Sequence, residues 1–264
     1  MTSSSITRVK LKQIAEKIEK AKRLDGRGLN DYREIKIEQG VIEKAEGSAR
    51  VLLGKTEVLV GTKVETGAPF PDTPNNGVLT VNAELVPLAS PDFEPGPPDE
   101  NSIELARIVD RGIRESEAID TEKLCIEPGK RVFVVFVDVY VLNHDGNLID
   151  ASALAAVAAL MNTKMPNYEV KDDELIIKQG YTPLPIKSHP ITVTLGKIKD
   201  KLIVDPWLEE EQAIDARLTM AFNNEGNICA IQKGCPGYFT QQQIIEGMKL
   251  AQKKAAELRK KLKW

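Results

Sequence analysis

The sequence predicts an α+β protein of two related halves, because strands followed by a helix occur twice along its 264 residues. In the first half, alternating apolar segments between residues 35 and 64 are followed by a β-branched and aromatic run, Arg131–Leu142, and then by the alanine-rich segment Ala151–Met161. In the second half, shorter apolar segments precede a long helical segment, Thr240–Lys263. A chain of this length buries most of its surface, so we expect both halves in one body.

The first elements are predicted from their periodicity. Segment 6–22 has apolar residues at helical spacing among lysines and glutamates, which predicts an amphipathic helix that docks on the body. Turn residues at 25–28 end this helix. The apolar positions that repeat at period two between 35 and 64, punctuated by glycines, predict strands of an antiparallel meander. The stripe of the predicted helix consists of Leu11, Ile14, Ala15 and Ile18.

A proline-rich stretch, 87–98, predicts a loop, because proline fits neither a helix interior nor a central strand. The segment 102–116 after it predicts a helix with Asn101 or Ser102 as its N-cap. Arg131–Leu142 is typical of a buried central strand. The core stripe predicted for helix 102–116 consists of Leu105, Ile108, Val109 and Ile113.

The second half repeats this plan with four strands and the terminal helix. Segment 164–188 is the expected connection between the halves. We therefore divide the chain into an N-terminal helical extension (1–22), a first half (23–165) and a second half (166–264). The four predicted strands are Ile191–Leu195, Leu202–Val204, Ala216–Phe222 and Ile228–Ile231.

The composition is that of an ordinary soluble globular protein, with 42% hydrophobic and 28% charged residues. A formal net charge of -3 supplies no global field for nucleic acid, so any RNA contact requires a local basic patch. Three cysteines without a CxxC pair predict neither a disulfide framework nor a zinc site. Without a signal-peptide core or a long apolar run, the chain is expected in the cytoplasm and not in a membrane.

Three arginines lie on one face of the helix predicted at 102–116. Arg107, Arg111 and Arg114 occupy positions i, i+4 and i+7. One interpretation is a solvated face paired with Glu104, Asp110 and Glu115. The other is a stripe of guanidinium groups that binds phosphates, whose oxygens match the planar fork of arginine.

The strand-to-helix junction 142–150 is the most informative stretch. A helix start after a glycine turn is a natural anion site, because free backbone N–H groups point there. This junction instead offers the apolar side chains of Leu148 and Ile149, and it ends with Asp150. A carboxylate at that position caps a helix well and repels phosphate, so the structural interpretation is favoured.

Two other groups suggest chemistry. His144, Asp145 and Ser152 do not predict a hydrolase triad, because no GxSxG elbow is present. An acidic run after residue 204 suits either a metal or a general acid, or else a solvated turn between strands, which composition favours. This run contains Asp205, Glu209, Glu210, Glu211 and Asp215.

Four motifs near the start of the sequence follow one another: Arg23–Arg27, Arg33, Ala45–Ala49 and Gly54–Val58. In this order they resemble the first strands of the RNase PH family of phosphorolytic exoribonucleases. The resemblance continues through the arginine-bearing helix, the 142–160 junction and the terminal helix, and so covers nearly the whole chain. It implies the RNase PH fold, which is ribosomal-protein-S5-domain-2-like, and no cofactor or bound metal.

Within that family the chain is most similar to the non-catalytic ring subunit of the archaeal exosome. This similarity is carried by the N-terminal extension before Arg23, by the segment Leu105–Arg111 and by the turn Val204–Pro206. It implies a hexameric ring of three heterodimers with the catalytic RNase PH-like subunit, and RNA-binding cap subunits on one face. It further implies that Arg107 and Arg111 reach across the heterodimer interface to hold single-stranded RNA.

The departures from the family pattern concern phosphate. Active members carry a Gly-Thr-Arg type phosphate grip at the junction, where this sequence has Asn147, Leu148 and Ile149, followed by Asp150. Loss of one such donor commonly costs a factor of about 10²–10³ in rate. We therefore expect a subunit that is inactive on its own. One alternative is an active phosphate-dependent 3′–5′ exoribonuclease that uses Asp205 or Asp215 and a divalent ion. The other is a tRNA-processing homologue that forms its own homo-hexamer.

Overall fold

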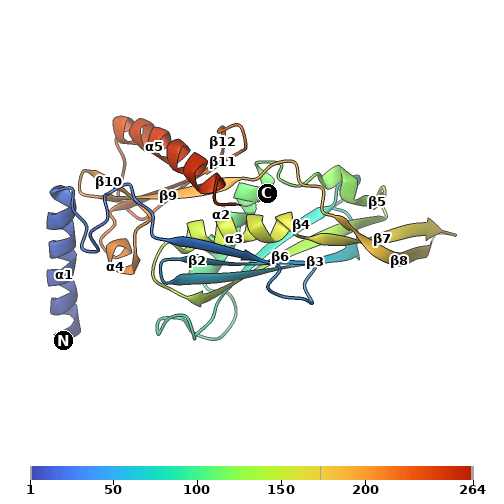
Figure 1. Cartoon of the computed structure of the whole chain (residues 1–264), viewed down its shortest axis with the longest axis horizontal. Helices are drawn as coiled ribbons and strands as arrows, with labels where there is room; N and C mark the ends of the chain where they lie inside the picture. The colour runs from blue at the N-terminus through green and yellow to red at the C-terminus, as the bar shows by residue number, and fades with distance from the viewer. Residues whose placement is uncertain (1, 173, 263–264) are drawn as a thin grey trace.

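A computed structural model describes residues 2–172 and 174–262. In this part of the chain, two sheets of six and four strands pack around one buried helix, and a third sheet is a two-stranded hairpin (Figure 1). The larger sheet has the order β1-β2-β3-β6-β4, and the short strand β5 pairs with the first residues of β6. Its strands pair antiparallel except for β4, which runs parallel to β6. Its strands are β1 (Ile35–Gln39), β2 (Gly47–Leu53), β3 (Thr56–Gly67), β4 (Val78–Leu85), β5 (Cys125–Glu127) and β6 (Arg131–Asn143).

The second sheet is antiparallel throughout, with the order β10-β9-β11-β12. The terminal helix α5 (Gln241–Arg259) packs on β9 and β11 and begins at the predicted cap, since the Thr240 hydroxyl accepts a hydrogen bond from Gln243 N. It ends four residues before Lys263, which lies outside the described residues. All four predicted strands are confirmed as β9 (Ile191–Ile198), β10 (Lys201–Val204), β11 (Ala216–Phe222) and β12 (Ile228–Gly234).

Helix α3 (Leu148–Met161) joins the two sheets, because it contacts β2, β3 and β6 on one side and β9 on the other (Figure 1). A helix that is apolar on all sides is one that is buried on all sides. Its alanines let both sheets approach its backbone closely: Ala155, Ala156, Ala158 and Ala159 are completely buried. The central strand before it, β6, is confirmed with every second residue in the core.

Helix α2 (Glu100–Arg114) begins earlier than predicted, and the predicted cap is wrong. The cap is Asp99, whose carboxylate accepts a hydrogen bond from Ser102 N at 2.8 Å, while Asn101 and Ser102 lie within the first turn. A carboxylate at the cap also suits the positive end of the helix dipole. The core stripe is confirmed, since all four of its apolar side chains are buried.

Helix α1 (Thr2–Glu19) lies at one end of the molecule and begins four residues before the predicted segment (Figure 1). It docks as predicted, through Ile14 and Ile18, which form a small separate core with Ile198 and Ile203. After α1 the chain passes through Arg23, whose guanidinium donates to the carbonyl of Val204 and so connects the first half with the second.

Several elements of the fold were not predicted. Strands β4 and β5 were missed altogether. The connection 164–188 contains a hairpin, β7 (Lys164–Lys171) and β8 (Glu174–Pro183), which projects from the end opposite α1 (Figure 1). Two short turns, η1 (Thr121–Leu124) and α4 (Leu208–Glu211), interrupt the loops. Within the described part of the chain, no helix combines the length and apolar character needed to cross a membrane.

Candidate functional site: the arginine face of α2 and the junction before α3

The arginine face of α2 contains two free guanidinium groups and one that is paired. Arg107 and Arg111 are exposed, and neither side chain forms a hydrogen bond or ion pair with any described residue. Arg114 donates to both oxygens of Asp110, at 2.7 and 3.0 Å, and to the carbonyl of Leu79 at 3.0 Å. The predicted stripe is therefore open at two positions, and the third is tied to its own helix.

Two of the three acidic residues that could pair with Arg107 and Arg111 are already engaged with other arginines. Asp110 is paired with Arg114, and Glu104 accepts from Arg217 of β11 at 2.6 Å. Arg111 lies beside the second sheet, where it lines a small hollow with Ile231 and Gln232 of β12. Arg111 thus stands next to the edge strand of that sheet.

The junction before α3 is a tight left-handed turn. Gly146 has φ of 84°, and a Cβ there would lie 2.5 Å from Leu208 N of α4, so only glycine fits. Asn147 is also left-handed, with φ of 53°, and it occupies the N-cap position without a capping side-chain hydrogen bond. Its backbone N–H instead donates to Oε1 of Glu211 at 2.7 Å.

The predicted role of Asp150 as a cap is wrong. It lies within the first turn of α3 and is buried, so its charge does not face an open anion site. Its Oδ2 accepts from the Tyr32 hydroxyl at 2.7 Å, from Asn147 Nδ2 at 3.0 Å and from Thr194 N at 3.2 Å. Burial raises the pKa of Asp150 to about 6, although these three hydrogen bonds oppose the shift. Asp150 therefore ties α3 and β9 to residues 23–34, the segment before β1 that is called the leader from here on.

A cavity of about 220 Å³ opens beside this junction. Its wall includes Leu148 and Ile149, so apolar side chains stand at the start of the helix, where a phosphate grip requires donors. Glu211 and Arg217 also line it. Burial raises the pKa of Glu211 to about 7, and Arg217 and Arg33 only partly offset this effect.

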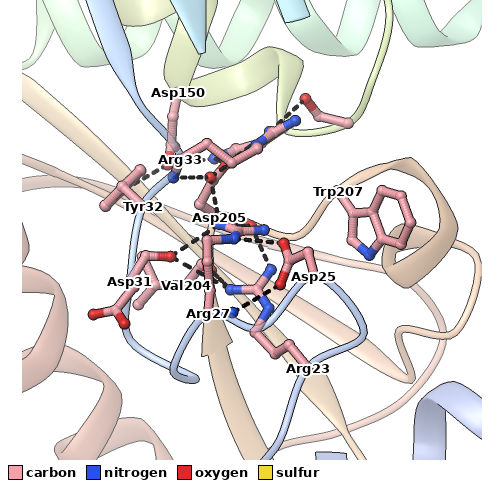
Figure 2. A network of polar contacts seen from close by, with 12 residues as sticks. Arg23, Asp25, Arg27, Asp31, Tyr32, Arg33, Asp150, Val204, Asp205 and Trp207 are labelled. Atoms are coloured by element: carbon pink, nitrogen blue, oxygen red, sulfur yellow. Dashed lines mark hydrogen bonds and ion pairs between the residues drawn. The ribbon is translucent and has the colours of Figure 1, made fainter. Parts of the chain in front are cut away.

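The acidic run after residue 204 is not the solvated turn that was favoured from composition. Asp205 is completely buried: it accepts from Arg27 and Arg33, each at 2.8 Å, and from Asn147 Nδ2 at 2.9 Å (Figure 2). Burial raises its pKa, but hydrogen bonds from Arg33 outweigh burial and hold the pKa below its usual value. Glu210 is buried in an ion pair with Arg23.

The other two carboxylates of this run lie apart from the buried network. Glu209 pairs with Lys10 of α1, and Asp215 is exposed and accepts from Lys199 N at 2.7 Å. Within residues 2–172 and 174–262, no three His, Cys, Asp or Glu side chains are grouped in a way that would hold a metal ion. The run therefore acts mainly by supplying carboxylates that pair with the arginines of the leader and hold the leader against the second half.

The contacts of Glu211, Arg217 and Tyr32 were not foreseen from sequence. Tyr32 lies 118 positions from Asp150, and Arg217 lies 113 positions from Glu104. No local spacing carries such pairings. The only available signal was that Arg23, Arg27 and Arg33 in the leader require carboxylate partners if they are buried.

Comparisons with known proteins agree with this architecture. A family model for the 3′ exoribonuclease family matches residues 31–166 with its domain 1, and a second matches residues 188–254 with domain 2. The relatives named exosome complex component Rrp42 include one from Thermococcus kodakarensis, 55% identical over 251 residues that cover 94% of this chain and 92% of the relative. Another, from Methanopyrus kandleri, is 51% identical over 98% of this chain and 97% of its own length.

Solved structures with the same fold include a chain of an Archaeoglobus fulgidus exosome with RNA bound to the active site. It has a TM-score of 0.91 and 49% identity, and the match covers 98% of this chain and 99% of that one. A chain of an archaeal exosome core has a TM-score of 0.88 and 44% identity over the full length of both chains. With both family domains matched in order across the two halves, this chain belongs to the RNase PH family of 3′ exoribonucleases.

Proposed function

We propose that this chain is a non-catalytic subunit of an archaeal exosome, a 3′-to-5′ RNA-degrading complex. The observation that carries the proposal is the apolar wall of Leu148 and Ile149 at the start of α3, where a phosphorolytic enzyme requires a hydroxyl and a guanidinium. Phosphate is an anion that must be held against an anionic RNA backbone, and these side chains offer it no donor. The names of the archaeal relatives support the assignment to the exosome.

In this assignment the chain pairs with the catalytic RNase PH-like subunit, and three such heterodimers form a hexameric ring below a cap of RNA-binding subunits. The free guanidinium groups of Arg107 and Arg111 hold single-stranded RNA near the active site of the partner. Phosphate contacts of this kind position a strand without reading its sequence. RNA contact by Arg114 remains a prediction, because its guanidinium is shared with Asp110.

A reconstitution experiment tests the proposal. The purified chain is incubated with poly(A), inorganic phosphate and Mg²⁺, first alone and then mixed with the catalytic subunit, and release of nucleoside diphosphates is followed over time. We expect no release by the chain alone and sustained release by the mixture. Robust release by the chain alone would instead support the alternative, an exoribonuclease active by itself.

A further inference from the structure

The cavity beside α3 contains two groups that ordinarily receive anions. One is the backbone N–H of Asn147 at the amino end of the helix, where the peptide dipoles concentrate positive charge. The other is the guanidinium of Arg217, which projects from β11. Both groups are already bound to carboxylates of the same chain.

The first carboxylate is that of Glu211, which accepts from Asn147 N at 2.7 Å. Backbone contacts hold it in place, because Leu208 N of α4 donates to the carbonyl of Asp145 at 3.2 Å. The close approach of Gly146 to the same turn leaves no room for even a Cβ. The last residue of α4 is therefore delivered to the start of α3 by packing of the main chain.

The second carboxylate is that of Glu104 on α2, which pairs with Arg217 at 2.6 Å. It projects from the same helix as Arg107 and Arg111 but pairs across to β11. The cavity is thus lined by two carboxylates and one guanidinium. Burial lowers the pKa of His144, which also lines the cavity and is therefore a neutral imidazole at pH 7.

We propose that the side chains of Glu104 and Glu211 occupy both anion-binding groups of this cavity and close it to inorganic phosphate. The inference rests on the proposed function and deepens it, since it gives a second barrier beside the missing grip. Apolar residues at 148 and 149 leave a phosphate poorly held. The two carboxyl groups compete for the two donors that are left, and in their ionised form they also repel an incoming anion.

The test removes both carboxylates and asks for phosphate binding. We compare the full-length wild-type chain with the double variant Glu104→Ala/Glu211→Ala by calorimetric titration with inorganic phosphate. We expect the variant to bind phosphate at least about tenfold more tightly than wild type, because Asn147 N–H and Arg217 become available. If circular dichroism shows the double variant to be unfolded, the single variants Glu104→Ala and Glu211→Ala, each of which frees one donor, are titrated and judged by the same criterion.

The matched control is Glu100→Ala/Glu209→Ala, which removes two carboxylates from the same two helices outside this cavity. It changes the net charge equally and should bind phosphate no better than wild type. A folded test variant that binds no more tightly than this control would overturn the inference. That failure is separate from failure of the proposed function, which would appear as release of nucleoside diphosphates by the wild-type chain alone.

Discussion

Two neighbouring helices of this protein differ in whether their anion-binding groups are free or already bound to carboxylates of the same chain. On α2, Arg107 and Arg111 are exposed and bind no described residue. At the start of α3, which packs against α2, the Asn147 N–H is bound to Glu211. Both regions have the chemistry to bind phosphate oxygens. The availability of a donor, and not its mere presence, therefore decides which of the two surfaces can bind an external phosphate group.

Burial explains why the two regions differ. A buried guanidinium or helix terminus requires a partner, since an uncompensated buried charge costs several kcal/mol. The junction meets this requirement internally, with Asp205 and Glu210 bound to the leader arginines. An exposed arginine carries no such requirement, because water solvates it. Arg107 and Arg111 therefore remain free for an external ligand.

The largest expected effect comes from disrupting the junction before α3. We call this junction the closed region, because its donors are bound to carboxylates of the same chain. Asp205→Ala leaves the partly buried guanidinium groups of Arg27 and Arg33 without the completely buried carboxylate that they share. We expect it to lower the free energy of unfolding by about 3–5 kcal/mol, measured by urea denaturation. Asp215→Ala is the control, since that exposed carboxylate accepts one hydrogen bond, from Lys199 N, and should cost about 1 kcal/mol or less. An equal loss in the free energy of unfolding for the two variants would contradict the stabilising role assigned to Asp205 between the leader and the second half.

The next effect concerns the arginine face of α2, which we call the open region because Arg107 and Arg111 bind no described residue. In the reconstituted ring, Arg107→Glu with Arg111→Glu should weaken RNA binding about tenfold or more and slow degradation, with assembly intact, because two phosphate contacts become repulsive. Filter binding measures the affinity, and gel filtration measures assembly.

Lys249→Glu with Lys253→Glu on α5 reverses the same number of charges on another exposed helix face. It should leave RNA affinity near that of wild type. If the two charge-reversed rings retain RNA equally well, the arginine face has no specific role.

A smaller effect should appear as a pH dependence of the closed region. The folded pKa values of Asp150 and Glu211 are about 6 and 7, above their ordinary values of 3.8 and 4.5. The folded state therefore binds more protons than the unfolded state over this range, so stability falls as pH rises from about 4.5 to 7. We expect a decline on the order of 1–3 kcal/mol in the free energy of unfolding.

Glu211→Gln removes one of the two groups and should flatten this decline. Glu209→Gln, on the same turn of α4, should not change it. Free energies of unfolding at several pH values measure both variants. A profile of Glu211→Gln that overlays that of wild type would show that Glu211 is not held at the junction as described.

The smallest effect sharpens the boundary between the two regions. Arg114→Ala breaks a half-exposed pair with Asp110, so it should cost about 1 kcal/mol or less in stability. It should also change RNA affinity less than Arg107→Ala, because its guanidinium is already paired. An RNA defect as large as that of Arg107→Ala would place Arg114 in the open region. The same filter-binding assay decides between these outcomes.

Much of the fold was predictable because its elements have strong periodicity. The stripe of Leu105 and Ile113, the central strand β6 and the alanine-rich α3 are all local patterns that burial confirmed. Strand β4 was missed, although it pairs with β6 and two of its residues, Leu79 and Ala83, are buried. The hairpin β7–β8 was missed because its residues are mostly exposed, and so they show little apolar alternation.

Only the exposed part of the site, the arginine face of α2, was predictable from the sequence. The arginine face follows from helical spacing, which fixes which side chains share a direction. The closed junction depends on pairings such as Asn147 with Glu211 and Asp205 with Arg33, across 64 and 172 positions. Composition suggested that Asp205 and Glu210 are solvated, but both are buried against leader arginines. Such partnerships are set by tertiary packing.

The central claim is that this chain contributes RNA contact and no phosphate chemistry. The most direct test is a ring assembled from the wild-type chain and a catalytic subunit carrying an inactivating active-site substitution. With poly(A), phosphate and Mg²⁺, we expect this ring to retain RNA in filter binding and to release no nucleoside diphosphate. Release of nucleoside diphosphate above that of a ring-free control would contradict the claim.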